Sequence, residues 1–250
     1  MSKRLIIAAM GLALAIAIGA TSGAVAGNGN GGKKGKAKKA EFTVRVENLS
    51  TATSLPTSVG AVPVPISPGV FAVHSGQNPL FRVGKKADEG TERIAEDGAI
   101  TKELATLIPL KKVTDGGLFE QAGGELGGAF EPGSETEFSF TGYRGQRLSL
   151  EAMFVQSNDW FYGTSGKGAK LFKGKKPISG DVTSAIGVYD AGTEVDEEPG
   201  NGTTAKPNQD PSAEDVGPSE NENVQLQSET GDGFSIPAPE ELIRVTVSAG

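Results

Sequence analysis

Short runs of alternating hydrophobic and polar residues recur along the chain. The first covers residues 42–47, with apolar side chains at every second position, and ends at Asn48. A period of two is typical of a β-strand with one buried face. Other runs of this kind predict strands over residues 70–73, 137–141, 147–155 and 181–189, and a C-terminal strand containing Leu242, Val245 and Val247.

A helical pattern occurs over residues 85–108, where apolar residues recur at helical spacing. Asp97 and Gly98 break this pattern and Pro109 ends it, so we expect two short helices inserted between strands. Residues 50–69 and 114–134 are rich in turn-forming residues and are predicted to be loops. Many short strands, frequent turns and few helices favour a mainly β protein, an antiparallel β-sandwich.

The N-terminus has the pattern of a cleavable export signal. Two basic residues, Lys3 and Arg4, precede an apolar run over residues 5–18, and the small residues of 24–26 fit a cleavage site after Ala26. The apolar run is shorter than the roughly 20 residues that cross a bilayer. We therefore expect a signal peptide over 1–26, a secreted protein without a membrane span, a flexible basic linker over 27–40 and one domain over 41–250.

Charge is divided unevenly along the chain. Residues 1–40 hold seven of the 24 lysines and arginines and none of the 31 acidic residues, so the remainder has a net charge of −14. Binding to nucleic acid requires a positive surface, which argues against such a partner for the domain. The basic residues of 33–39 would allow at most a weak contact with an anionic surface.

Two acidic segments, 155–163 and 188–196, follow strand-like runs and contain glycine. The chain has no cysteine and one histidine, so a metal bound here would take oxygen ligands, which favours a hard cation such as Ca²⁺. Asp159, Asp190 and Glu194 fit the charged part of such a shell, and Asn158 is a neutral candidate. The alternative is that these carboxylates are only solvated.

Several segments of the chain resemble the spondin-domain family in the same order. They are FTVRVENLS (42–50), SPGVFAVH (67–74), LFRVGKKADEGTERIAEDG (80–98), SNDWFYG (157–163) and GDVTSAIGVYDAGTEVDEEPG (180–200). The resemblance implies a C2-like β-sandwich that binds calcium through three acidic side chains at one end. On this chain these are Asp159, Asp190 and Glu194; Asn158 replaces a proline of animal members, and Glu194 replaces an aspartate.

The resulting hypothesis is a secreted, calcium-binding domain that acts in adhesion or recognition of an extracellular protein or glycan, and not an enzyme. The alternatives are a structural envelope component or a carbohydrate-binding module with a structural metal, or a glycoside hydrolase that uses its carboxylates. His74 is interpreted as a packed or hydrogen-bonded residue, since no nucleophile motif accompanies it. Asn48 and Asn201 lie in N-glycosylation patterns.

Overall fold

The computed structural model describes residues 39–121, 128–210 and 212–250. This part of the chain is mostly β-strand, its sheets are antiparallel, and few helices accompany them, so the predicted mainly β, sandwich-type fold is confirmed. The signal peptide predicted over 1–26 and most of the predicted linker lie outside the described residues. Lys39 and Ala40, which were assigned to the linker, already belong to the first strand.

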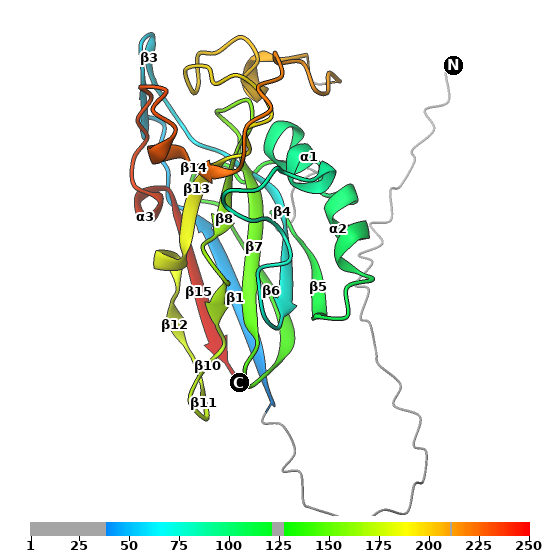
Figure 1. Ribbon diagram of the computed structural model, residues 1–250. Coiled ribbons are helices and arrows are strands. Elements are labelled where there is room, and N and C mark those ends of the chain that lie inside the picture. Colours follow the sequence, from blue (N-terminus) through cyan, green and yellow to red (C-terminus); the bar gives the residue numbers. More distant parts are fainter. Residues whose placement is uncertain (1–38, 122–127, 211) are drawn as a thin grey trace, which may run out of the picture. The chain divides into compact units, whose positions relative to one another are not determined.

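Two sheets face each other (Figure 1). The smaller sheet has the order β12-β15-β1-β6. The larger sheet has the order β14-β13-β8-β7-β4-β5, and β9 pairs with β7 at its margin. The strands of the smaller sheet are β12 (Gly180–Asp181), β15 (Ile243–Ala249), β1 (Lys39–Asn48) and β6 (Glu135–Tyr143). Those of the larger sheet are β14 (Gln225–Leu226), β13 (Ile186–Asp190), β8 (Trp160–Thr164), β7 (Arg147–Phe154), β4 (Ile66–His74), β5 (Val113–Phe119) and β9 (Ala169–Lys170).

The main hydrophobic core lies between these sheets. Phe71 of β4 stacks on Phe138 of β6 with ring centroids 4.2 Å apart, which joins the two layers directly. Burial of aromatic side chains of this kind is a dominant favourable term in folding. The period-two pattern of the sequence accounts for this core, because alternate residues of each strand point into it.

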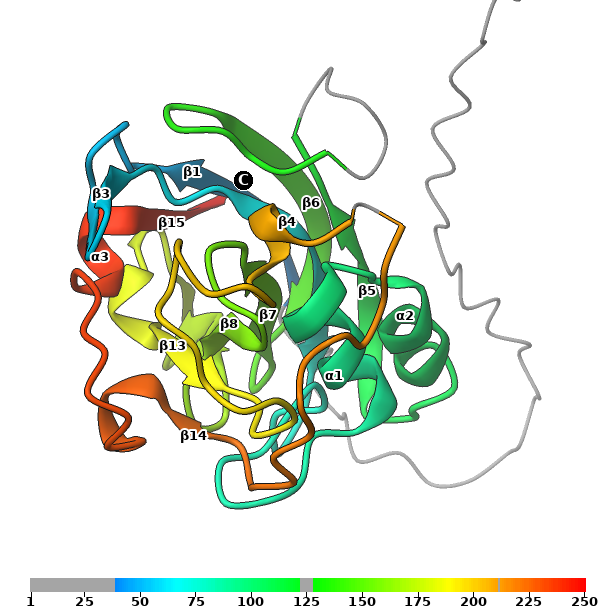
Figure 2. The same cartoon turned by 90° about the horizontal axis from the view of Figure 1, so that it is seen from above.

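The helices α1 (Glu89–Asp97) and α2 (Thr101–Leu107) cover the outer face of the larger sheet (Figure 2). Every residue of β4 is therefore buried: Phe71 and Val73 face the sandwich core, whereas Val70 and Ala72 face the helices. The larger sheet thus has two covered faces, and polar residues of its strands on the helix side are buried as well.

The two helices match the prediction, including the break between them. Asp88 caps α1 by accepting hydrogen bonds from the backbone N–H groups of Gly90 and Thr91, both at 3.1 Å. Gly98 ends α1 in the left-handed conformation, with φ +66°. Further short elements are α3 (Pro239–Leu242), the 3₁₀ turns η1 (Thr183–Ala185), η2 (Lys206–Asn208) and η3 (Gln227–Glu229), and the strand pair β10 (Phe172–Lys173) and β11 (Lys176–Pro177).

Four loop or strand predictions differ from the structure. Leu242, which was predicted to lie in the C-terminal strand, ends α3, and β15 begins at Ile243. The predicted loop 50–69 contains the hairpin of β2 (Leu55–Thr57) and β3 (Gly60–Val62) as well as the start of β4, and the predicted loop 114–134 begins as β5. Glycines suit β5 because a side chain on Gly117 would come 3.1 Å from the ring of Phe71. The strand predicted over 181–189 is interrupted by η1.

The acidic stretch from Glu194 to Glu220 is a long irregular excursion and lies beyond the ends of β8 and β13 (Figure 1). It returns alongside the loop after β13, where Glu194 and Ser219 form an isolated antiparallel bridge. Among the described residues, the helices are all too short or too polar to cross a bilayer.

Candidate metal centre

Two of the predicted acidic residues lie together because their strands are neighbours. β8 begins at Trp160 and β13 ends at Asp190, and these two residues pair across the antiparallel ladder. Asp159 immediately precedes Trp160, so its side chain and that of Asp190 lie at the same end of the sheet. Asp196 joins them from the following loop, and one carboxylate oxygen of each residue lies within 4.8 Å of the others.

Asp159 has one oxygen bonded and one oxygen free. Its Oδ2 accepts hydrogen bonds from the backbone N–H groups of Thr193 at 2.9 Å and Glu194 at 3.0 Å, and from the Thr193 hydroxyl at 3.2 Å. Its Oδ1 is buried and has no hydrogen-bond partner in the part of the chain that the structure describes. A buried carboxylate oxygen without a partner is costly, and a cation is one way to satisfy it.

Local hydrogen bonds also fix the other two carboxylates. Asp190 accepts from the backbone N–H of Gly192 at 2.6 Å and from the side chain of Gln225 at 3.2 Å. Asp196 accepts from the indole N–H of the fully buried Trp160 at 2.5 Å. The carboxylates of Asp190 and Asp196 are therefore held in place by hydrogen bonds, and each keeps further oxygen lone pairs that could bind a cation.

The three carboxylates resist ionisation in each other's presence. Burial, together with the negative charge of Asp190, raises the pKa of Asp159 well above its usual range. The same two causes raise the pKa of Asp196 to about 8, and burial raises the pKa of Asp190. A bound cation would oppose all of these effects, because it stabilises the ionised form of each ligand. These residues could thus hold a metal ion.

Glu194, the third residue of the predicted site, lies in a second acidic group. Its carboxylate oxygen lies within 4.8 Å of carboxylate oxygens of Glu96 in α1 and Asp215 in the acidic excursion. The backbone of Glu194 bonds to Asp159, whereas its Oε1 accepts a hydrogen bond from the backbone N–H of Gly217 at 2.7 Å. The three predicted ligands are therefore divided between two groups, and their binding of a single ion stays a prediction.

In the second group, Glu96 and Glu194 are buried and, among the described residues, incompletely bonded, whereas Asp215 is exposed. Oε2 of Glu96 and Oε2 of Glu194 are buried without partners. Burial, together with the charge of Glu194, raises the pKa of Glu96 to about 7. Gly217 leaves room for this arrangement, because a Cβ there would come 2.2 Å from Glu194 Oε2. This group could hold a cation too.

Asn158, the neutral candidate, lies beside the second group. Its side-chain N–H donates to the carbonyl of Val195 at 2.9 Å, and its Oδ1 is buried without a partner. The side chain also lies next to Glu194, where it lowers the pKa of that carboxyl against the larger effect of burial. Asn158 thus lies next to Glu194, and its binding of a cation stays a prediction.

Asp196, Glu96 and Asp215 were not predicted as site residues. The buried Trp160 offers the one sequence signal for Asp196, since a buried indole N–H requires an acceptor, although this signal does not say which acidic residue supplies it. Glu96 and Asp215 come from a helix and from a long loop whose path the sequence pattern does not specify. Their meeting depends on tertiary packing alone.

An open pocket of about 340 Å³ adjoins the first acidic group, with Asp190 and Asp196 in its lining. Glu220, Glu222 and Asp232 also line it, and among the described residues the lining includes no lysine or arginine. The electrostatic potential in this pocket is therefore strongly negative, which favours entry of cations from solvent.

His74 lies apart from the acidic groups, at the end of β4. It is fully buried, and its Nε2 lies 2.9 Å from the hydroxyl of Ser149, which is also fully buried. Burial and the nearby charge of Lys112 lower the pKa of His74 to about 4, so its imidazole is neutral. The pair belongs to the packed layer beneath the helices, where no substrate has access to the hydroxyl.

No protein-family model and no curated protein sequence matches the chain. The resemblance to spondin domains and the C2-like arrangement of the sandwich therefore stay predictions.

Proposed function

We propose that this chain is a secreted, calcium-binding β-sandwich of the spondin type that takes part in extracellular adhesion or recognition. Two observations on Asp159 support the proposal best: among the described residues its buried Oδ1 has no hydrogen-bond partner, and its carboxylate forms one group with those of Asp190 and Asp196. The spondin-like segments of the sequence and its export signal supply the extracellular setting.

Calcium suits this group better than other common metals. The chain has no cysteine, and its one histidine is buried beside Ser149, so soft and imidazole-preferring metals lack their usual ligands. Calcium accepts six to eight oxygen ligands in a flexible shell, which irregular loops can supply. Magnesium requires a stricter octahedral arrangement, and we expect it to bind more weakly.

The ion would act by joining segments that are distant in sequence. Asp159 precedes β8, Asp190 ends β13, and Asp196 belongs to the loop that follows. An ion bound by all three would rigidify the loops at this end of the sandwich. Binding residues often lie on loops that a rigid sheet holds in position. We therefore propose that the extracellular ligand contacts the loops at this end of the sandwich.

Single substitutions distinguish two possible sets of calcium ligands. The structure groups Asp196 with Asp159 and Asp190, whereas the resemblance to spondin domains implies Glu194 in its place. We expect Asp159→Asn, Asp190→Asn and Asp196→Asn each to weaken calcium binding at least about tenfold, because each removes a charged ligand. Calorimetric titration of the purified protein measures this directly. Glu194→Gln should change the affinity of this site much less, since its carboxylate lies in the other group.

Asp210→Asn is the matched control, because Asp210 lies in the same acidic excursion but is exposed, and among the described residues its side chain bonds only to Ser212. Calcium at 100 times its dissociation constant should stabilise the wild-type fold by about 2.7 kcal/mol, which is a rise in melting temperature of roughly 5–11 °C. An Asp210→Asn effect equal to that of Asp159→Asn would contradict the proposal, as would absence of calcium uptake.

The second candidate function is a domain in which the ion has a purely structural role. The near-complete burial of Asp159 and Asp190, 0% and 1% exposed, favours it, because an ion held there would have few positions open to an external ligand. A glycan and matrix-protein binding screen with calcium and with chelator separates the two. Binding that requires calcium supports recognition, whereas absence of binding in both conditions supports the structural role.

A further inference from the structure

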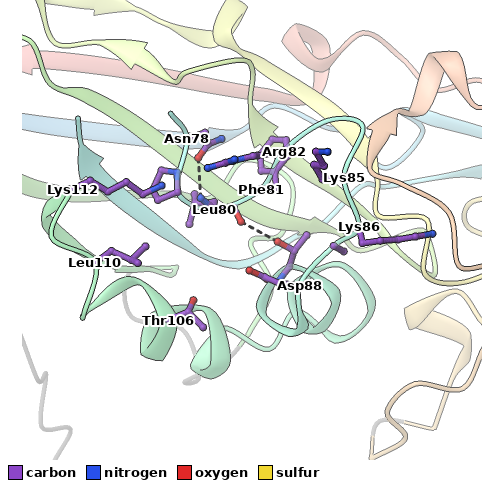
Figure 3. Close-up of a pocket in the computed structure, with 13 residues that line it drawn as sticks. Asn78, Leu80, Phe81, Arg82, Lys85, Lys86, Asp88, Thr106, Leu110 and Lys112 are labelled. Atoms are coloured by element: carbon purple, nitrogen blue, oxygen red, sulfur yellow. Dashed lines mark hydrogen bonds between the residues drawn. The ribbon is translucent and has the colours of Figure 1, made fainter. Parts of the chain in front are cut away.

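A second pocket, on the helix side of the larger sheet, is lined by basic residues although the domain is acidic overall. It has a volume of about 340 Å³ and lies between the segment 78–88, α2 and the turn before β5 (Figure 3). Its basic residues are Arg82, Lys85, Lys86 and Lys112. This concentration of positive charge stands out in a domain with a net charge of −14 over residues 41–250.

Arg82 and Lys112 point toward one another from opposite sides of this pocket (Figure 3). Among the described residues, no carboxylate forms an ion pair with either of them. Burial, together with the positive charge of Arg82, lowers the pKa of Lys112, which shows that the two cations repel each other. An anion between them would remove this repulsion.

Packed segments hold the backbone of both residues in place. The ring of Phe81, directly before Arg82, lies 4.9 Å from that of Phe161 and 4.8 Å from that of Tyr189. On the other side, the carbonyl of Lys112 accepts a hydrogen bond from the backbone N–H of Ser75 at 3.0 Å. The backbone that carries the two cations is thus in place before any ligand arrives, which reduces the entropy lost on binding.

The other charged residues of the lining are already engaged or peripheral. Asp88 is the acidic residue of the lining, and its Oδ1 caps α1. The ammonium group of Lys86 points away from the pocket and donates to the backbone carbonyls of Asn221 and Glu222. Lys85 is exposed at the rim and adds long-range positive charge.

Apolar side chains complete the lining, among them Pro79, Leu80 and Leu110. A bare inorganic ion would leave this surface unused, whereas an organic ligand would cover it. The volume is at the lower end of the roughly 300–1,000 Å³ found for small-molecule sites, so the ligand should be small.

We propose that this pocket binds a small organic anion of the size of one acidic sugar unit, with its carboxylate or sulfate group between Arg82 and Lys112. The apolar face of the ligand lies against Leu80 and Leu110. This site is separate from the acidic metal centre and does not depend on it. Binding here should therefore be the same with calcium and with chelator.

Calorimetric titration of the purified full chain with four probes tests the proposal. Glucuronate and glucose 6-sulfate should bind saturably, at least about tenfold more tightly than neutral glucose and inorganic sulfate. Arg82→Gln and Lys112→Gln should each lose at least about tenfold in affinity for both acidic sugars, the scale expected for a lost charge-assisted hydrogen bond. Lys111→Gln removes the same charge from an exposed neighbour outside the lining and should change affinity less than about twofold.

Four results would overturn the proposal: no saturable binding of either acidic sugar, unchanged affinity in Arg82→Gln and Lys112→Gln, an equal loss in Lys111→Gln, or equally tight binding of inorganic sulfate. Circular dichroism and melting temperature of each variant show whether the fold is intact. A loss of binding in a variant that keeps the wild-type melting temperature supports the assigned contact.

Discussion

Asp159 uses one carboxylate oxygen to hold the backbone of the loop after β13 and leaves the other oxygen buried and unpartnered. In the absence of a cation, burial and the charge of Asp190 raise the pKa of Asp159 and so favour its protonated form. With a cation the same group is ionised and becomes a ligand. In the proposed site, a single side chain would therefore couple the order of the loop to metal binding.

Glu103 of α2 and Glu151 of β7 form a different kind of buried acidic pair, between the helices and the larger sheet. Glu151 is fully buried with both carboxylate oxygens unpartnered, and Glu103 Oε1 is unpartnered as well. Burial, followed by the charge of Glu103, raises the pKa of Glu151 well above its usual range. Burial, followed by the charge of Asp88, raises the pKa of Glu103 to about 8. Both carboxyls are therefore protonated at neutral pH.

This pair should make the fold less stable as the pH rises. Both pKa values are higher in the folded chain than in the unfolded chain, where glutamate titrates near 4.5. The folded state therefore binds more protons above that pH, and the free energy of unfolding falls as the pH increases toward about 8. Glu103→Gln and Glu151→Gln should each raise the free energy of unfolding at pH 8 by at least about 1.4 kcal/mol, the equivalent of one pKa unit.

Denaturant titrations at pH 5 and pH 8, without divalent metal, measure this effect. Glu131→Gln, at an exposed position, is the control and should follow the wild type at both pH values. If Glu103→Gln and Glu151→Gln kept the full wild-type dependence on pH, the pair would not be its source.

At the scale of elements, the end of α1 depends on one glycine. Gly98 has φ +66°, donates its backbone N–H to the carbonyl of Ile94 at 3.0 Å, and would place a Cβ 2.9 Å from the Cβ of Ser67. An alanine would therefore suffer both left-handed strain and a contact with β4. We expect Gly98→Ala to lower the free energy of unfolding by more than about 2 kcal/mol.

Substitution of Gly133 separates the backbone strain from the steric contact with β4. Gly133 has φ +80°, but a Cβ there would have no atom within 4 Å. Gly133→Ala should therefore show the strain alone, about 1 kcal/mol. Equal losses in chemical denaturation of the two variants would show that α1 is not packed tightly against β4.

The elements that the sequence predicted correctly are those with a local signal. Residues 42–48 have a period of two, and the break at Asp97 and Gly98 follows from helix-ending chemistry. β5 was predicted as a loop because its glycines resemble turn residues, whereas they serve to pack against Phe71. The local sequence pattern does not show which residues of different strands will contact each other.

The candidate site shows the same limit. Asp159 and Asp190 could be predicted because each adjoins a strand end, and neighbouring antiparallel strands bring those ends together. Asp196 could not be ranked above Glu194, because the hydrogen bonds to Trp160 and Gly217 decide which side chain enters which group. Those bonds depend on the path of a long irregular loop.

At the scale of the whole molecule, the described domain combines a sandwich core with helices on the outer face of the larger sheet (Figure 2). Acidic residues gather where β8 and β13 meet the irregular excursion. The basic pocket lies between the segment 78–88 and the helices. The fold therefore offers separate places for a cation and for an anionic ligand, on one rigid framework.

The central claim is that a calcium ion binds among Asp159, Asp190 and Asp196. Anomalous diffraction from crystals grown with calcium locates such an ion directly. We predict a peak within about 2.3–2.6 Å of an oxygen from each of the three carboxylates. Absence of a peak, or a peak only among Glu96, Glu194 and Asp215, would contradict the claim.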